Sequence, residues 1–308
     1  MLDVKTATPD VILYAQHGWA DDHRAIASLA ASLATPNTIA ITPNLGYLKT
    51  WLRIEPLIQA VEVSVLENMQ RYPTSVIRIV GHSMGGLIWL EVLARHPELW
   101  ANVESLVLVG SPVGGADLAR ALDPLGVGVG IARDLGINRR EIAEAIAAKI
   151  PTLVIAGDID NGSDGTVTVQ CTKIFGAEFV RLLGIHHAAL KNHPAVAEAI
   201  RQFWAIAAPP SLPDESSPDF SRTLIRRLQS VPGMTDAHER DFAKAEIVLV
   251  YDNGVTIRTW KNLMGIDHVF VACPHGQCLY SGFVGWLHAE NLRQTLDQLQ
   301  QEQVISLV

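Results

Sequence analysis

The chain of 308 residues contains only three cysteines and no long apolar or basic run. Such a small, odd number of cysteines does not suggest a disulfide framework and favours a reducing compartment. The first apolar run, Val11–Ala15, is too short for a signal peptide or a membrane span. The net charge is −8, and Lys and Arg are not clustered as phosphate-backbone binding requires. We therefore expect a cytoplasmic protein with no integral membrane segment and no nucleic-acid partner.

Cofactor and metal signatures are also missing. No Walker or G-x-G-x-x-G pattern follows a strand-like run, so no nucleotide cofactor is expected. Cys273 and Cys278 lie near His268 and His275, but no second cysteine pair follows them. A β-turn with buried thiols is therefore favoured over a four-ligand zinc site. The sequence predicts neither a cofactor nor a metal.

Apolar residues make up 48% of the chain and charged residues 18%, which fits a protein with a large core. Residues 1–206 alternate short Val- and Ile-rich runs with longer amphipathic stretches. The short runs lack polar alternation, which is typical of strands covered on both faces. This order predicts an α/β catalytic domain with a mostly parallel, doubly wound sheet. The expected strands are Val11–Ala15, Thr38–Thr42, Val76–Val80, Leu106–Val109, Thr152–Ala156 and Phe179–Leu183, and the expected helices are Asp22–Ala34, Ile54–Arg71, Met84–His96, Arg139–Lys149 and Pro194–Ala205.

One connection in this region, Ser111 to Ile150, is unusually long and rich in glycine. Long insertions in compact domains are often functional, so this one is either a lid over a site or a loop that carries one packing helix. Its apolar residues suggest an apolar group in the substrate.

The composition changes after this part of the chain. Pro, Ser and acidic residues concentrate near its end, which predicts a linker over residues 207–219. Residues 220–308 then form a small, mostly-β accessory module, with turn signals such as Asn253-Gly254 between its strands and a helical pattern at Glu290–Gln300. The strands expected in this module are Ile247–Tyr251, Val255–Trp260, Val269–Ala272 and Phe283–Leu287.

Gly81-His82-Ser83-Met84-Gly85 fits the pattern G-x-S-x-G and lies between an expected strand and an expected helix. In that setting the serine occupies a sharp turn that exposes its hydroxyl above the sheet. A glycine turn without chemistry is the alternative, but the strand before it and the helix after it favour a nucleophile. We therefore expect Ser83 to be catalytic.

A tetrahedral oxyanion needs two hydrogen-bond donors. The first is the backbone N–H of Met84, which follows the serine. The second is expected from the loop after the first strand, where Gly18 lets the backbone turn, and we assign it to the N–H of Trp19. Asp21 or Asp22 could equally cap the helix that follows.

A serine hydroxyl needs a base, and the base needs an acid to orient it. In α/β enzymes with this turn, the acid and then the histidine follow the serine along the chain. The loop after Thr152–Ala156 contains several aspartates, of which Asp164 is favoured and Asp160 is second, although Asp beside Gly is often only a turn residue. Two adjacent histidines follow the last strand; His187 is favoured as the base over His186.

These motifs together resemble the α/β-hydrolases of the lipase/esterase kind. The resemblance spans Val11 to Trp204 and includes HGWADD, GHSMGG, GSPVGGADL, DGTV and HHAAL. It implies hydrolysis of a carboxylic ester, small-molecule or lipid, through an acyl-enzyme. Ser83 is then the nucleophile, His187 the base and Asp164 the acid, with Trp19 and Met84 in the oxyanion hole. Thioesterase, amidase or acyltransferase activity on the same residues, or a non-catalytic binding protein, are the alternatives.

The segment Tyr280 to Leu292 resembles the closing strand of bacterial SH3-like domains, in which G-W-x-x-A-x-x-L recurs. This resemblance covers only the end of the C-terminal module. It implies a module that binds a ligand or a partner.

Overall fold

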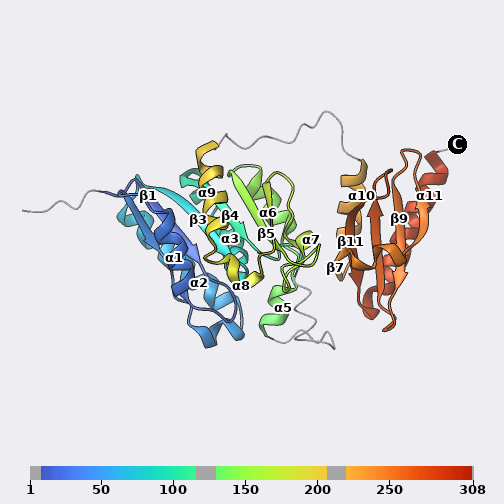
Figure 1. The fold of residues 1–308 in the computed structure, drawn as a ribbon, viewed down its shortest axis with the longest axis horizontal. Coiled ribbons are helices and arrows are strands. Elements are labelled where there is room, and N and C mark those ends of the chain that lie inside the picture. The colour runs from blue at the N-terminus through green and yellow to red at the C-terminus, as the bar shows by residue number, and fades with distance from the viewer. Residues whose placement is uncertain (1–7, 116–129, 207–219, 307–308) are drawn as a thin grey trace, which may run out of the picture.

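The computed structural model describes residues 8–115, 130–206 and 220–306. The described residues contain one sheet in the N-terminal part of the chain and a separate sheet in the C-terminal part (Figure 1). The expected linker, residues 207–219, lies outside the described residues, as does the stretch 116–129 of the long connection.

The N-terminal sheet has six strands among the described residues, in the order β2-β1-β3-β4-β5-β6. Every neighbouring pair is parallel, as the sequence predicts. The strands are β1 (Val11–Gln16), β2 (Thr38–Ile41), β3 (Val76–His82), β4 (Val103–Val109), β5 (Thr152–Asp158) and β6 (Glu178–Leu183).

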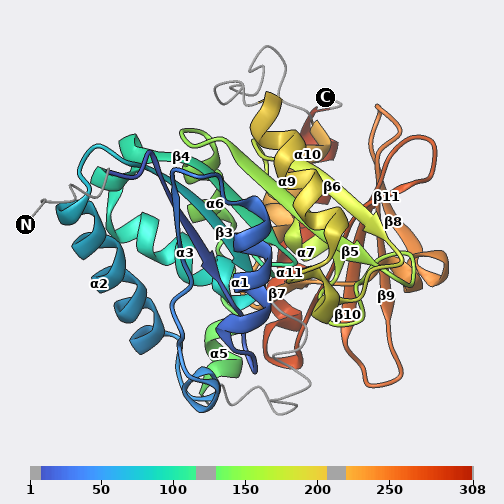
Figure 2. The ribbon, with the colours of Figure 1, turned by 60° about the vertical axis from the view of Figure 1, so that its left-hand side comes forward.

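Helices cover both faces of this sheet (Figure 2). One face packs on α1 (His23–Leu33) and α9 (Pro194–Ile206), and the other packs on α2 (Glu55–Arg71), α3 (Met84–Arg95) and α6 (Arg140–Ala147). Apolar positions on both faces of the central strands are therefore removed from water, which is the main favourable contribution to folding. The predicted α/β architecture is confirmed.

The expectation that all six strands are buried is wrong for the two edges. In β6, Phe179 is 40% exposed and Leu183 is 75% exposed, and β2 is only partly covered. An edge strand has one neighbour instead of two, so its side chains are covered less completely.

The C-terminal sheet has five antiparallel strands among the described residues, in the order β7-β11-β10-β9-β8. Two helices, α10 (Phe220–Gln229) and α11 (Ala289–Ser306), contribute Leu224, Leu228 and Leu292 to its apolar core. The strands are β7 (Met234–Asp236), β8 (Glu246–Val250), β9 (Thr256–Lys261), β10 (Asp267–Ala272) and β11 (Cys278–Val284).

The sequence-based prediction differs from this part of the structure in two places. The last strand, β11, runs from Cys278 to Val284 instead of from Phe283 to Leu287, and Trp286–His288 forms a short 3-10 turn, η4. Sequence reasoning also missed α10 and β7. The other three strands predicted in the C-terminal part lie within two residues of their observed bounds.

A buried ion pair connects the C-terminal sheet with a helix that packs on the N-terminal sheet. Arg140 of α6 donates to the carboxylate of Asp236 in β7, and both side chains are almost fully buried. The same guanidinium donates to the carbonyl oxygens of Gln170 (3.0 Å) and Lys173 (3.2 Å), at α7 (Val169–Thr172). Burial opposes its charge, but Asp236 holds the pKa of Arg140 above its ordinary value. The C-terminal sheet is thus fixed against α6 and α7.

Candidate active site

Ser83 lies between β3 and α3 with φ +54° and ψ −125°, a backbone conformation that non-glycine residues rarely adopt. The neighbouring Gly85 is required by close packing, because a Cβ there would overlap the carbonyl oxygen of Gln16 in β1. The turn holds the serine at the carboxyl end of β3 and directly before the N-terminus of α3.

The structure brings Ser83, His187 and Asp164 together. Oγ of Ser83 is 3.0 Å from Nε2 of His187, and Nδ1 of His187 is 2.6 Å from Oδ2 of Asp164. The backbone N–H of His187 also donates to the carbonyl oxygen of Asp164, at 3.0 Å. His187 begins the short helix α8 (His187–Leu190), which follows β6. A hydroxyl, an imidazole and a carboxylate are therefore connected in one hydrogen-bonded row.

Backbone amides hold the carboxylate of Asp164 in place. Its Oδ1 accepts from the N–H of Thr166 at 2.9 Å and from the N–H of Val167 at 2.7 Å. The side chain is only 2% exposed. Oδ2 is left for His187, so the loop that carries Asp164 sets the direction in which the carboxylate points.

The alternatives left open by the sequence lie elsewhere. Asp160 bonds to Ser163 and His238, and its side chain is 42% exposed. His186 is exposed at the N-terminus of α8. The geometry therefore favours Asp164 over Asp160, and His187 over His186.

The loop after β1 passes directly beside the nucleophile. A Cβ on Gly18 would lie 2.8 Å from Cβ of Ser83 and 3.3 Å from the amide nitrogen of Met84, so only glycine fits there. The backbone N–H groups of Trp19 and Met84 donate to no acceptor among the described residues. Both amides remain available for a substrate oxygen, in the part of the chain where the sequence predicts an oxyanion hole.

Two buried histidines support this arrangement. Nε2 of His82 donates to the carbonyl oxygen of His187 at 3.1 Å. Nε2 of His17 accepts from the N–H of Leu45, so its proton is on Nδ1, which donates to the carbonyl oxygen of Gly18 at 3.1 Å. Burial lowers the pKa of His17, and it lowers the pKa of His82 far below its usual value. Both rings are neutral and act as positioning groups.

This neutrality predicts that stability falls in mild acid. The histidines of the unfolded chain take up protons near pH 6.5, whereas the lowered pKa values of His82 and His17 delay their protonation in the folded chain to lower pH. Their contribution is fully present above pH 6.5 and is lost as the pH falls below it, by up to about 1.4 kcal/mol per pH unit for each histidine. Urea unfolding at pH 5, 6 and 7 measures the slope. His82→Gln keeps an N–H donor but does not titrate, so it should flatten the slope; an unchanged slope contradicts the assignment.

Ser83 lines a pocket of about 210 Å³ that is open to solvent. Its lining includes the apolar side chains of Trp19, Leu135, Val167 and Ala188. Leu135 belongs to α5 (Ile131–Leu135), in the described part of the long connection. Sequence reasoning missed a further feature of the lining, the ion pair of Asp21 with Lys191 at 2.9 Å, because its partners lie far apart in the chain.

Two other expectations concern metal binding and membranes. Cys273 and Cys278 flank the turn between β10 and β11, and both thiols are free, but they are only partly buried and not buried as the sequence predicts. Among the described residues, no group of three or more His, Cys, Asp or Glu side chains could hold a metal ion. No helix in the described ranges is both long and apolar enough to cross a membrane.

A model of the PGAP1-like alpha/beta domain matches residues 49–159, about a third of the chain. The esterase Est1E from Butyrivibrio proteoclasticus, solved with ferulic acid, is 15% identical with a TM-score of 0.50, and the match covers 65% of this chain and 90% of Est1E. The lipase BlEst2 from Bacillus licheniformis is 16% identical with a TM-score of 0.47, over 64% of this chain and 93% of that one. No curated protein matches the sequence.

Proposed function

Since this chain has the α/β-hydrolase fold, we propose that it is a serine hydrolase that cleaves carboxylic esters through an acyl-enzyme. One observation carries the proposal. The hydroxyl of Ser83 lies 3.0 Å from an imidazole nitrogen of His187, whose other nitrogen lies 2.6 Å from the buried carboxylate of Asp164. This is the arrangement by which a serine hydroxyl is activated at neutral pH.

In the proposed reaction, Oγ of Ser83 attacks the ester carbonyl carbon while Nε2 of His187 takes the hydroxyl proton. Asp164 keeps the other ring nitrogen protonated and stabilises the imidazolium. The oxyanion that forms accepts hydrogen bonds from the amides of Trp19 and Met84. His187 then gives its proton to the departing alkoxide, which leaves an acyl-Ser83 ester. Water, deprotonated by His187, releases the acid in a second, equivalent cycle.

Covalent labelling tests the nucleophile. A fluorophosphonate probe phosphonylates an activated serine with loss of fluoride, so the wild-type protein should gain the mass of one phosphonyl group, located at Ser83 by peptide mapping. Ser83→Ala should take up none under the same conditions. A folded wild-type protein without an adduct overturns the proposal and favours the alternative, a non-catalytic binding protein.

A substrate panel tests the ester class. Thioesterases, amidases and acyltransferases can use the same residues, so aryl esters of increasing acyl length are compared with the matching thioesters and amides. The apolar lining of the cavity favours esters with an apolar acyl group. A larger kcat/KM for thioesters or amides than for the esters of the same acyl chain contradicts the ester assignment.

A further inference from the structure

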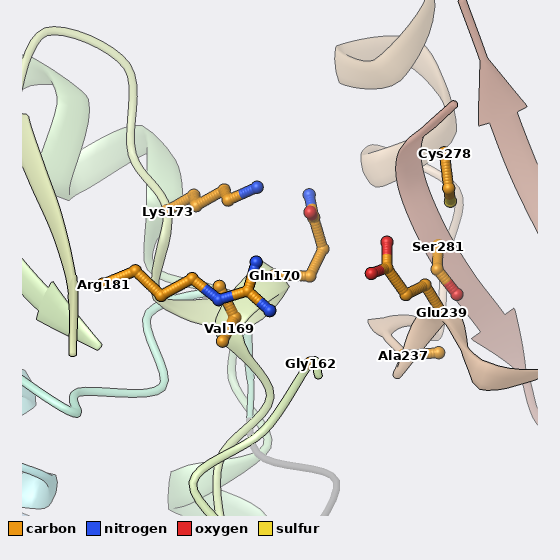
Figure 3. A pocket seen from close by; sticks show the side chains of 9 residues that line it. All are labelled: Gly162, Val169, Gln170, Lys173, Arg181, Ala237, Glu239, Cys278 and Ser281. Carbon is orange, nitrogen blue, oxygen red and sulfur yellow. The ribbon is translucent and has the colours of Figure 1, made fainter. Parts of the chain in front are cut away.

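The loop that carries Asp164 is in contact with the C-terminal sheet. Figure 3 shows this zone, with Gly162 and Val169 on one side of a pocket and Ala237 and Ser281 on the other. Directly after Ala237 comes His238, whose side chain is 9% exposed and whose Nε2 is 3.2 Å from Oδ1 of Asp160. An imidazole from the C-terminal part thus meets the loop four residues before Asp164.

The direction of this hydrogen bond follows from the other ring nitrogen. Nδ1 of His238 accepts from the backbone N–H of Arg240 at 2.9 Å, so the ring proton is on Nε2 and is donated to Asp160. Burial raises the pKa of Asp160, but hydrogen bonds from Ser163 and His238 outweigh burial and hold the pKa below its ordinary value. Asp160 is therefore an ionised acceptor.

Hydrogen bonds connect Asp160 with the residues on both sides of Asp164. Asp160 accepts from the N–H of Ser163 at 2.8 Å and from its hydroxyl at 2.9 Å. Oγ of Ser163 accepts in turn from the N–H of Gly165 at 3.1 Å. The residue before Asp164 and the residue after it are thus both held by a network that ends on His238.

His238 is itself firmly placed. Its carbonyl oxygen accepts from Oγ of Ser281 in β11 at 3.2 Å. The imidazole packs on Gly162, where an added Cβ would lie 2.7 Å from the ring. Two residues earlier, Asp236 forms the buried ion pair with Arg140. The donor to Asp160 is therefore part of a fixed surface and not a mobile side chain.

We propose that His238 is a positioning residue for the Asp164 loop, and that the C-terminal part is therefore required for full activity instead of being an independent accessory. The proposal rests on the proposed function, because it concerns the orientation of the acid in that mechanism. A carboxylate displaced by a fraction of an ångström orients His187 less well, which lowers the rate of the chemical step without changing substrate binding.

Kinetics of the full-length chain test this role. His238→Phe keeps the ring volume but removes the donor, and it should lower kcat about 10-fold while KM stays within about 2-fold. His238→Gln restores an N–H donor and should recover most of the loss. His275→Ala, in the exposed turn between β10 and β11, is the matched control and should behave as wild type. A His238→Phe enzyme with wild-type kcat overturns the proposal.

A coupling measurement separates positioning from general destabilisation. If His238 acts through Asp164, His238→Phe should change kcat by less than about 2-fold in an Asp164→Asn background. A 10-fold loss in both backgrounds contradicts the proposal. If His238→Phe does not fold, Asp160→Asn takes its place, because it alters the acceptor of the same hydrogen bond and should show the same coupling to Asp164→Asn; equal losses in both backgrounds contradict the proposal.

Hydrogen exchange gives a readout that does not depend on catalysis. His238→Phe should speed exchange of the Gly165, Thr166 and Val167 amides, which close the Asp164 loop, whereas His275→Ala should not. Unchanged exchange overturns the proposal even in an inactive protein. If the wild-type chain forms no fluorophosphonate adduct but His238→Phe still speeds exchange, the proposed function is refuted and the positioning of the loop by His238 is not.

Discussion

Ser83→Ala is expected to lower kcat for an aryl ester by about 10⁶-fold and to leave KM within a few-fold of wild type. Oγ of Ser83 is the only protein atom that bonds to the acyl group in the proposed reaction, so without it only water can attack. His187→Ala should cost about the same, because a serine without its base is not activated. The substrate still meets the same cavity walls, so binding changes little.

The double variant Ser83→Ala with His187→Ala makes the prediction specific. Residues that act as one unit are not additive, so the double variant should be no slower than either single one. Initial rates with active-site titration measure all three, and circular dichroism checks that each is folded. Losses that multiply in the double variant contradict a shared mechanism.

His186→Ala is the matched control for the base. This histidine is the neighbour of His187 but is exposed, and the hydrogen bond to Ser83 comes from His187. Its replacement should leave kcat within about 3-fold of wild type. A loss comparable to that of His187→Ala would show that the assignment of the base to His187 is wrong.

The sequence predicts the N-terminal sheet well because its central strands are buried on both faces. Runs such as Val11–Ala15 and Val76–Val80 have no polar alternation, and this pattern is characteristic of parallel strands. β7 is only three residues long and contains Thr235 and Asp236, so no apolar run marks it. It forms a strand because it pairs with β11 and because Asp236 meets Arg140, and both partners are distant in the chain.

The nucleophile could be predicted from the sequence because its signal is local. The turn at Ser83 needs small residues on either side, and the sequence has glycine at both positions, Gly81 and Gly85. The acid has no comparable signal, since Asp158, Asp160 and Asp164 lie close together in the sequence beside glycines. Backbone amides decide among them: those of Thr166 and Val167 orient Asp164 toward His187, while Asp160 turns toward Ser163.

The contact of the C-terminal part with the Asp164 loop could not be predicted from the sequence. His238 and Asp160 are 78 residues apart, on opposite sides of the segment 207–219. Nothing in the local pattern around His238 marks it as a partner of the Asp164 loop. A composition change in the chain indicated separate modules, whereas the buried Arg140–Asp236 pair joins them.

Asp164→Asn should lower kcat by about 10⁴-fold, a smaller loss than that of Ser83→Ala or His187→Ala. The amide keeps the shape of the carboxylate and can still accept from Thr166 and Val167 through its oxygen. Its NH₂ group then faces Nδ1 of His187 and donates to it, so the ring proton moves to Nε2. A His187 protonated at Nε2 cannot accept the proton of Ser83. The loss is therefore in kcat and not in KM, as steady-state kinetics will measure.

Asp160→Asn separates the two candidate acids. It leaves Asp164 beside His187 and weakens only the contact with Ser163 and His238, so its cost should be no more than about 10-fold in kcat. Both variants remove one negative charge from the same loop, so a general electrostatic effect would make them equal. A ratio near 1000 between them therefore measures the orientation of His187 itself, and equal losses would show that neither carboxylate acts through the imidazole.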